Sequence, residues 1–194
     1  LSAFVTPNHP MVGEVISEAS LYLNKWTNNP SFTGYQRNNP NAVLQQMAAI
    51  YAALQAKKIA YIVPPASYEK TGQRIRLSHV VLEQKKGTCL DLAVLYASCL
   101  EAVGLNPLLI LKRGHALTGC FIEEETFSEY IQDDPAAITK RMADGINEIA
   151  IVECTAFSAG KNIEFDDACE HGKAALADPD EFKLSVDVMR SRAG

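Results

Sequence analysis

The sequence predicts an α+β fold in which N-terminal helices and a central helix pack on a mostly antiparallel sheet. Three observations lead to this prediction. Apolar residues recur at helical spacing over residues 12–54 and again over residues 88–103, and short apolar, β-rich runs follow from residue 108 onward. A chain of 194 residues is long enough to bury a core, so we expect one domain over residues 1–194. Because the chain begins at Leu1 without a Met, we expect this domain to be excised from a longer protein.

The composition excludes several classes of partner. Basic residues number 18 against 23 acidic ones, and the net charge of −5 argues against a nucleic-acid groove or an anionic membrane surface, since both require a basic face. No apolar run approaches the ~20 residues that span a bilayer, and no secretory signal is visible. The five cysteines include no C-x-x-C pair, which is typical of reduced cytoplasmic thiols and not of a zinc site. Motifs for metals, nucleotides and flavins are absent as well. We therefore expect a cytoplasmic protein with no cofactor, no direct nucleic-acid binding and no membrane contact.

Two helices are predicted in the N-terminal part. The apolar stripe of the first follows Pro10 and consists of Val12, Val15, Ile16, Ala19, Leu23 and Trp26. That of the second consists of Val43, Met47, Ile50, Tyr51 and Leu54. Residues 31–41 are polar and contain Gly34 and Pro40, which indicates a loop between the helices. Residues 59–63 are β-rich and predict a short strand, whereas residues 66–87 predict an ordered loop followed by a short helix.

The helix predicted over residues 88–103 has the clearest boundaries. Thr88 can cap it, Asp91 matches the acidic position of a capping box, and Gly104 and Pro107 prevent its continuation. Strands are expected over residues 108–111 and 115–122, joined by a tight turn, and over residues 149–157. A short helix is expected from Asp134-Pro135 to Gly145, another helix over residues 163–177, and a last strand over residues 182–188.

Cys89 is the candidate nucleophile. It lies one residue after the predicted helix cap, where unpaired backbone N–H groups and the helix dipole favour negative charge. The thiolate is the nucleophilic form of cysteine, so this position favours reactivity, and Gly87 just upstream would let a substrate approach closely. The structural alternative is a small thiol in the core.

A base and an orienting acid for this cysteine are predicted from the strands. His115 opens a strand directly after the helix–strand unit, and histidine titrates nearest to neutral pH. Glu153 lies among the apolar residues of the strand predicted over 149–157, where an unpaired carboxylate would be costly, so it is expected to orient the imidazole. The alternatives are a hydrogen-bonded strand histidine and an ion pair at the sheet edge.

These residues together resemble the transglutaminase-like superfamily. The resemblance is carried by Gly87-Thr-Cys-Leu-Asp-Leu-Ala93, by Gly114-His115-Ala and by Val152-Glu-Cys-Thr155, and it covers residues 45–190. It implies a papain-like α+β fold with nucleophile Cys89, base His115 and acid Glu153, in a bacterial domain of a larger protein. The usual acid of this superfamily is Asp, and this chain has Glu at the matching position.

Acyl transfer also requires hydrogen-bond donors for the tetrahedral oxyanion. The Cys89 backbone N–H is one candidate, and the side chain of Gln73 or of Gln84 is a second. We place Gln73 in the site, because its polar segment is expected to border the cleft. The predicted function is cysteine-dependent acyl transfer on an amide of a protein or peptide, most simply hydrolysis by a protease or amidase; transamidation stays open. The alternative is an inactive fold that binds a peptide or another domain of the parent chain.

Overall fold

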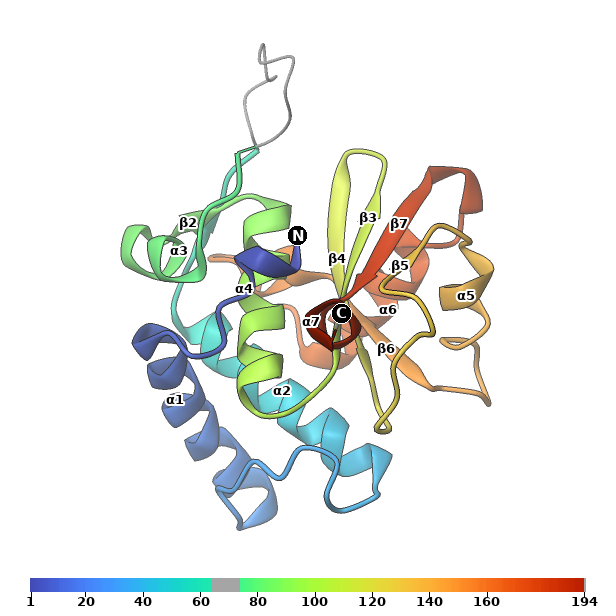
Figure 1. Cartoon of the computed structure of the whole chain (residues 1–194). Helices are drawn as coiled ribbons and strands as arrows, with labels where there is room; N and C mark the ends of the chain where they lie inside the picture. Colours follow the sequence, from blue (N-terminus) through green and yellow to red (C-terminus); the bar gives the residue numbers. More distant parts are fainter. Residues whose placement is uncertain (64–73, 194) are drawn as a thin grey trace.

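The computed structural model describes residues 1–63 and 74–193, and in it helices α1 to α4 cover one side of a sheet (Figure 1). These helices are α1 (Pro10–Thr27), α2 (Pro40–Ala56), α3 (Ser78–Gln84) and α4 (Cys89–Ala102). The sheet has five antiparallel strands in the order β5-β7-β3-β4-β6. The strands are β3 (Pro107–Lys112), β4 (His115–Phe121), β5 (Ile131–Gln132), β6 (Ile149–Val152) and β7 (Phe182–Asp187). The predicted α+β class with an antiparallel sheet is therefore confirmed.

The first N-terminal helix begins at Pro10, as the sequence predicts, whereas the second begins at Pro40, inside the loop predicted over residues 31–41. The His9 side chain caps α1 by accepting from the Met11 N–H, and Asn39 caps α2 by accepting from the Asn41 N–H, each with Pro as the first helical residue. Their apolar stripes pack toward α4. Trp26 does not belong to the core as predicted: it lies in the last turn of α1 and is 47% exposed.

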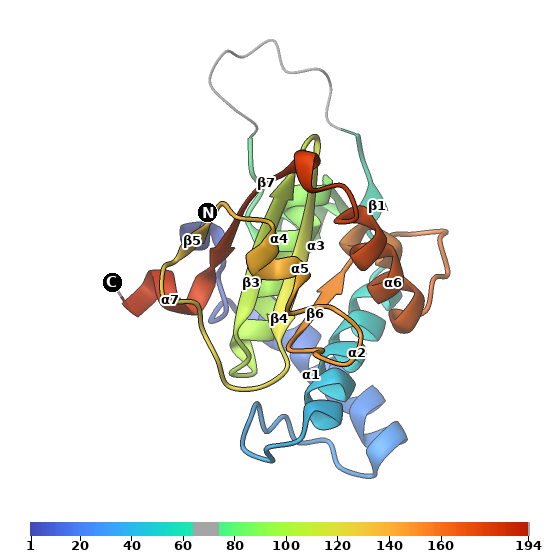
Figure 2. The ribbon, with the colours of Figure 1, turned by 90° about the vertical axis from the view of Figure 1, so that its right-hand side faces the viewer.

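Helix α4 is the centre of the molecule. Every residue from Cys89 to Leu100 is buried, because α1, α2 and α3 pack on one side of the helix and strands β3 and β4 on the other. Figure 2 shows α4 behind the strands of the sheet. A helix that is apolar on all faces is typical of such a central position. The predicted capping box of Thr88 and Asp91 is present.

Several predicted elements are shorter than expected. The strand predicted over residues 59–63 is a two-residue strand, β1 (Ala60–Tyr61), which pairs in parallel with β2 (Lys86–Gly87) outside the main sheet. The helix expected up to Gly145 is limited to α5 (Ala136–Thr139). The last strand ends at Asp187, because α7 (Val188–Ala193) begins at Val188. The predicted helix 163–177 is confirmed as α6 (Phe165–Ala175), and β5 was not predicted.

Short 3-10 turns connect the larger elements: η1 (Ser2–Phe4), η2 (Cys154–Phe157) and η3 (Pro179–Glu181). The strand predicted over residues 149–157 is wrong in its second half, because β6 ends at Val152 and η2 follows. Glu153 therefore lies at the junction between a strand and a turn. None of the helices in the described ranges has the length and hydropathy of a transmembrane span.

Candidate active site

Cys89 is the first residue of α4, and the start of this helix is fixed by a buried carboxylate. Asp91 accepts from the Thr88 N–H at 3.0 Å, while Thr88 Oγ1 accepts from the Asp91 N–H at 3.3 Å. Asp91 also binds Arg76: the Arg76 backbone N–H donates to Oδ1 of Asp91 at 2.8 Å, and its guanidinium donates to Oδ2 at 2.9 Å. These contacts fix the backbone on which the thiol is carried.

The strand pair β1–β2 lies directly beside this helix start. The Ile62 N–H donates to the Gly87 carbonyl at 2.9 Å, and Tyr61 is the register partner of Gly87. A Cβ added to Gly87 would lie 3.2 to 3.3 Å from the Asp91, Leu92 and Val81 side chains. Close packing within the protein thus accounts for this glycine, which the sequence suggested as an opening for substrate.

His115 opens β4 and contacts Glu153. The turn between β3 and β4 consists of Arg113 and Gly114, and Gly114 adopts a left-handed φ of +69° that suits glycine. His115 Nε2 donates to Glu153 Oε2 at 2.6 Å. The side chains are partly covered, with exposed fractions of 23% for His115 and 14% for Glu153. The structure therefore brings the predicted base and the predicted acid into direct contact.

Glu153 is positioned by its place at the strand end. Its backbone N–H donates to the Ala168 carbonyl on α6 at 3.0 Å. Its second oxygen, Oε1, accepts from the N–H and the hydroxyl of Thr155 at 3.0 and 2.8 Å. Sequence reasoning missed Thr155 as a site residue, although an acid followed two positions later by Thr is typical of such a side-chain–backbone turn.

The titration of the histidine reflects its neighbours. Side-chain hydrogen bonding with Cys89, and then with Glu153, raises the pKa of His115 from 6.5 to about 9, although burial acts in the opposite direction. Burial acts to raise the pKa of Glu153, but hydrogen bonds from His115 and Thr155 outweigh it and hold this pKa below its ordinary value. Burial and the nearby Cys89 and Glu153 groups raise the pKa of Tyr61. His115 therefore interacts with both Cys89 and Glu153.

Cys89 differs from the other cysteines. Burial raises the pKa of the Cys120 and Cys169 thiols to about 12, and it raises the pKa of Cys99 and Cys154 further. Cys99, Cys120 and Cys154 are fully buried, whereas Cys89 keeps 6% of its surface exposed beside the half-exposed strand β1. Cys169 on α6 is more exposed than Cys89, but the hydrogen bond with His115 is made by Cys89, so chemistry at a thiol is best supported at Cys89.

The predicted side-chain donor for the oxyanion is not placed by the structure. Gln73 lies outside the described residues. Gln84, the alternative, is exposed at the end of α3. The backbone N–H of Cys89 is at the start of α4, where helical N–H groups have no intrahelical partner.

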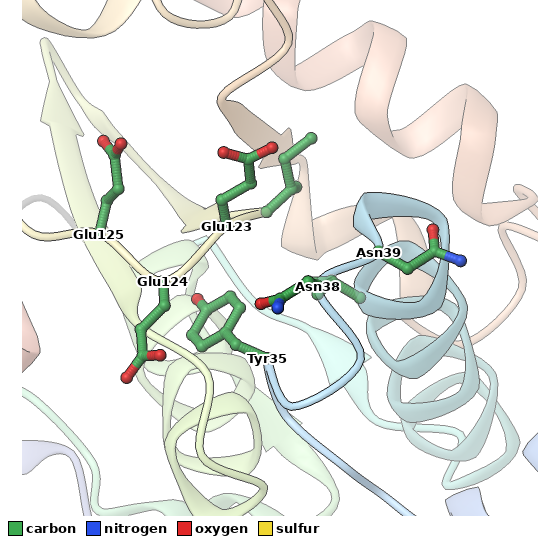
Figure 3. Close-up of a pocket in the computed structure, with 8 residues that line it drawn as sticks. Tyr35, Asn38, Asn39, Glu123, Glu124 and Glu125 are labelled. Atoms are coloured by element: carbon green, nitrogen blue, oxygen red, sulfur yellow. The ribbon is translucent and has the colours of Figure 1, made fainter.

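Several cavities lie away from these residues, among them one of about 470 Å³ between the N-terminal residues and Arg192. Another, of about 350 Å³, is lined by Tyr35, Asn38 and the glutamates at 123–125 (Figure 3), whose carboxylates point in different directions. A groove of about 540 Å³ lies between α2, β6 and α6. Within residues 1–63 and 74–193, no group of three or more His, Cys, Asp or Glu side chains is arranged to hold a metal ion.

Comparisons with protein-family models, with curated proteins and with solved structures found no match to this chain. The arrangement of Cys89, His115 and Glu153 is therefore the basis for assigning a function.

Proposed function

We propose that this chain is a cysteine-dependent acyl-transfer domain, similar to the transglutaminase-like superfamily, that hydrolyses an amide bond of a protein or peptide. The observation that carries the proposal is the contact of His115 with Glu153 at 2.6 Å beside a cysteine at a helix N-terminus. In the proposed mechanism, Glu153 holds the imidazole in one orientation. This leaves the ring to exchange a proton with the Cys89 thiol.

Each residue then has a defined step. His115 accepts the thiol proton, and Cys89 Sγ attacks the amide carbonyl carbon to form a tetrahedral oxyanion, which the Cys89 N–H stabilises. The C–N bond breaks as His115 donates the proton to the leaving amine, and a thioester remains. Water then loses a proton to His115 and attacks the thioester. The C–S bond breaks with its electron pair on Cys89 Sγ, His115 returns the proton to this sulfur, and the carboxylic acid is released.

Glutamate in place of the usual aspartate is compatible with this role. Glu153 follows the last paired residue of β6, Val152, and starts a 3-10 turn. The position past the strand end accommodates the additional methylene while the carboxylate still contacts His115. Hydrolysis is the simpler outcome because it needs no second substrate site; an amine in place of water would give transamidation.

Selective alkylation tests the proposal. Iodoacetamide at neutral pH should label Cys89 at least about tenfold faster than Cys99, Cys120 or Cys154, as measured by peptide mass spectrometry. The variant His115→Ala should lose this selectivity, whereas His171→Ala, which removes an exposed histidine of α6, should keep it.

Turnover is the second measurement. The wild-type chain should cleave members of a peptide library that Cys89→Ala leaves intact. The hydrolase would be ruled out if all five cysteines of wild type were labelled at equal rates and if wild type cleaved no more peptide than Cys89→Ala. Capture of a peptide or of another part of the parent chain by both proteins, without turnover, would favour the binding module instead.

A further inference from the structure

A lysine is held beside the candidate active site by contacts that lead to its acid. Lys161 Nζ donates to Thr155 Oγ1 at 3.2 Å, and this hydroxyl donates to Glu153 Oε1 at 2.8 Å. The same ammonium lies 5.5 Å from the centre of the Tyr61 ring, within the range of a cation–π contact. Lys161 is thus positioned between the acid and the strand pair that borders Cys89.

This ammonium has no acidic partner among the residues that the structure describes. Neighbouring cations differ in this respect, because Lys112 pairs with Glu181 at 2.6 Å and Arg76 pairs with Asp91 at 2.9 Å. The contacts of Lys161 are with a neutral hydroxyl and an aromatic ring. Within residues 1–63 and 74–193 the nearest acid linked to this ammonium is Glu153, one hydroxyl away and bonded to His115, so the ammonium is available to a ligand carboxylate.

Two other exposed basic residues lie close along the chain to the candidate catalytic residues. Lys86 precedes Cys89 by three residues and Arg113 lies in the turn that leads into β4; both are exposed. Three residues span at most about 10 Å at about 3.5 Å per residue, so the Cα atoms of Lys86 and Cys89 are no farther apart than that. This distance is close to one Debye length at physiological salt. In the described ranges, Glu83 and Glu164, the exposed carboxylates nearest along the chain to Lys86 and Lys161, form no ion pair with them. Arg113 lies beside Glu181, whose carbonyl accepts from the Arg113 N–H at 2.8 Å and whose carboxylate pairs with Lys112. The basic residues Lys86, Arg113 and Lys161 contrast with the net charge of −5 of the whole chain.

We infer that the site takes a peptide with a carboxylate next to the scissile amide, and that Lys161 binds this carboxylate while Lys86 and Arg113 add to the local positive field. The inference rests on the proposed function for its scissile amide. An acidic side chain and a free C-terminal carboxylate share this chemistry. Tyr61 would form the wall of the same subsite.

A matched peptide library tests the inference. Its members are ten-residue peptides that differ at one position as Glu, Gln or Lys, each with a free or an amidated C-terminus, and cleavage is followed by mass spectrometry. Wild type and Lys25→Met, which removes an exposed lysine on α1, should cleave Glu members or free-terminus members about three- to tenfold faster than their neutral counterparts. Lys161→Met should abolish this ratio and Lys161→Arg should restore it. The ratio should also fall as salt rises.

The outcomes separate this inference from the proposed function. Turnover without a preference for carboxylates would overturn the inference and leave the hydrolase intact. If no peptide is cleaved, fluorescence anisotropy of the labelled Glu and Gln peptides with Cys89→Ala decides. If Cys89→Ala binds the Glu peptide more tightly than the Gln peptide and Cys89→Ala/Lys161→Met does not, the carboxylate subsite is supported although the proposed hydrolysis fails. Equal binding of both peptides by Cys89→Ala overturns the carboxylate subsite.

Discussion

Glu153 uses its two carboxylate oxygens for different purposes. Oε1 accepts from the N–H and hydroxyl of Thr155 and so caps the turn η2, while Oε2 accepts from His115. Because the first set of bonds fixes the carboxylate, the second places the imidazole ring. A residue that caps a turn and orients a histidine joins local structure to the proposed chemistry.

The pKa of His115 provides a prediction at this scale. In wild type the ring should titrate near pH 9, because Cys89 and Glu153 both stabilise its charged form. Replacing either group, in Cys89→Ala or Glu153→Gln, should move this pKa toward 6.5, and the larger change is expected for Cys89→Ala since Cys89 is the larger cause. The pH dependence of the His115 NMR signals measures this directly.

The sign of the stability effect follows from the same shift. A histidine whose pKa is raised on folding stabilises the fold fully below pH 6.5 and loses that contribution, about 3 kcal/mol, as the pH rises through about 9. The alkaline limb of any kcat/KM profile should also lie near pH 9 in wild type and at lower pH in Glu153→Gln. A His115 ring that titrates at 6.5 in all three proteins would contradict the assigned contacts.

Most residues of the candidate site could be predicted because each has a local signature. Cys89 follows a capping box, and His115 opens a strand after a turn containing glycine. Thr155 could not be predicted as a site residue, because it bonds to Glu153, which was expected inside a strand and lies after the end of β6. The exposure of Trp26 also could not be predicted, because helical spacing does not show where the neighbouring elements stop.

The start of α4 allows a prediction at the scale of elements. Asp91 is fully buried and accepts from Thr88 and Arg76, so Asp91→Asn removes a charge that these donors require. The variant should lower the free energy of unfolding by about 2–4 kcal/mol in urea titrations. Asp166→Asn, in the exposed first turn of α6, is the matched control and should lower it by less than about 1 kcal/mol. Equal effects would show that the buried clamp is unimportant.

Helix α6 approaches β6 so closely that one glycine is required. A Cβ on Gly172 would lie 2.7 Å from the Ile151 carbonyl oxygen, so Gly172→Ala should push the helix away and destabilise the protein by about 1–3 kcal/mol. Gly13 on α1 has nothing within 4 Å of an added Cβ, and Gly13→Ala should stabilise by up to about 1 kcal/mol. Opposite signs in thermal unfolding confirm the contrast, whereas stabilisation by both changes would refute the close approach.

Length and periodicity explain which elements could be predicted. Helices α1, α2, α4 and α6 each contain several turns, so their apolar spacing is visible in the chain. The strands β1, β2 and β5 contain two residues each and exist only through their partners. No pattern in so short a segment distinguishes such pairing from a loop.

For the whole molecule, the position of α4 implies cooperative unfolding. The helix contributes to one core together with α1, α2 and strands β3 and β4, and a second apolar cluster on the other strand residues, such as Ile110 and Phe121, packs without α4. Loss of α4 would therefore remove the packing between the helices and the sheet. The single Trp, Trp26 on α1, reports on the helical layer, and the thiol of Cys120 on β4 reports on the sheet.

The helical layer and the sheet should unfold at the same urea concentration. Trp26 fluorescence measures the midpoint of the helical layer, and the reaction of Cys120 with a thiol reagent measures that of the sheet. Mutants of either layer, such as Ala19→Gly on α1 or Ile110→Val on β3, should move both midpoints together. Two separate transitions would show that the helices and the sheet are independent units.

The close contact between Gly172 and Ile151 also affects how copies of the protein behave in concentrated solution. The outer side of β6 is occupied by α6, through this contact and the bond from the Glu153 N–H to the Ala168 carbonyl. The opposite border strand, β5, is only two residues long. Edge strands that are covered, like β6, or very short, like β5, leave few free backbone N–H and C=O groups for pairing with another chain. The folded protein should therefore resist fibrillar aggregation.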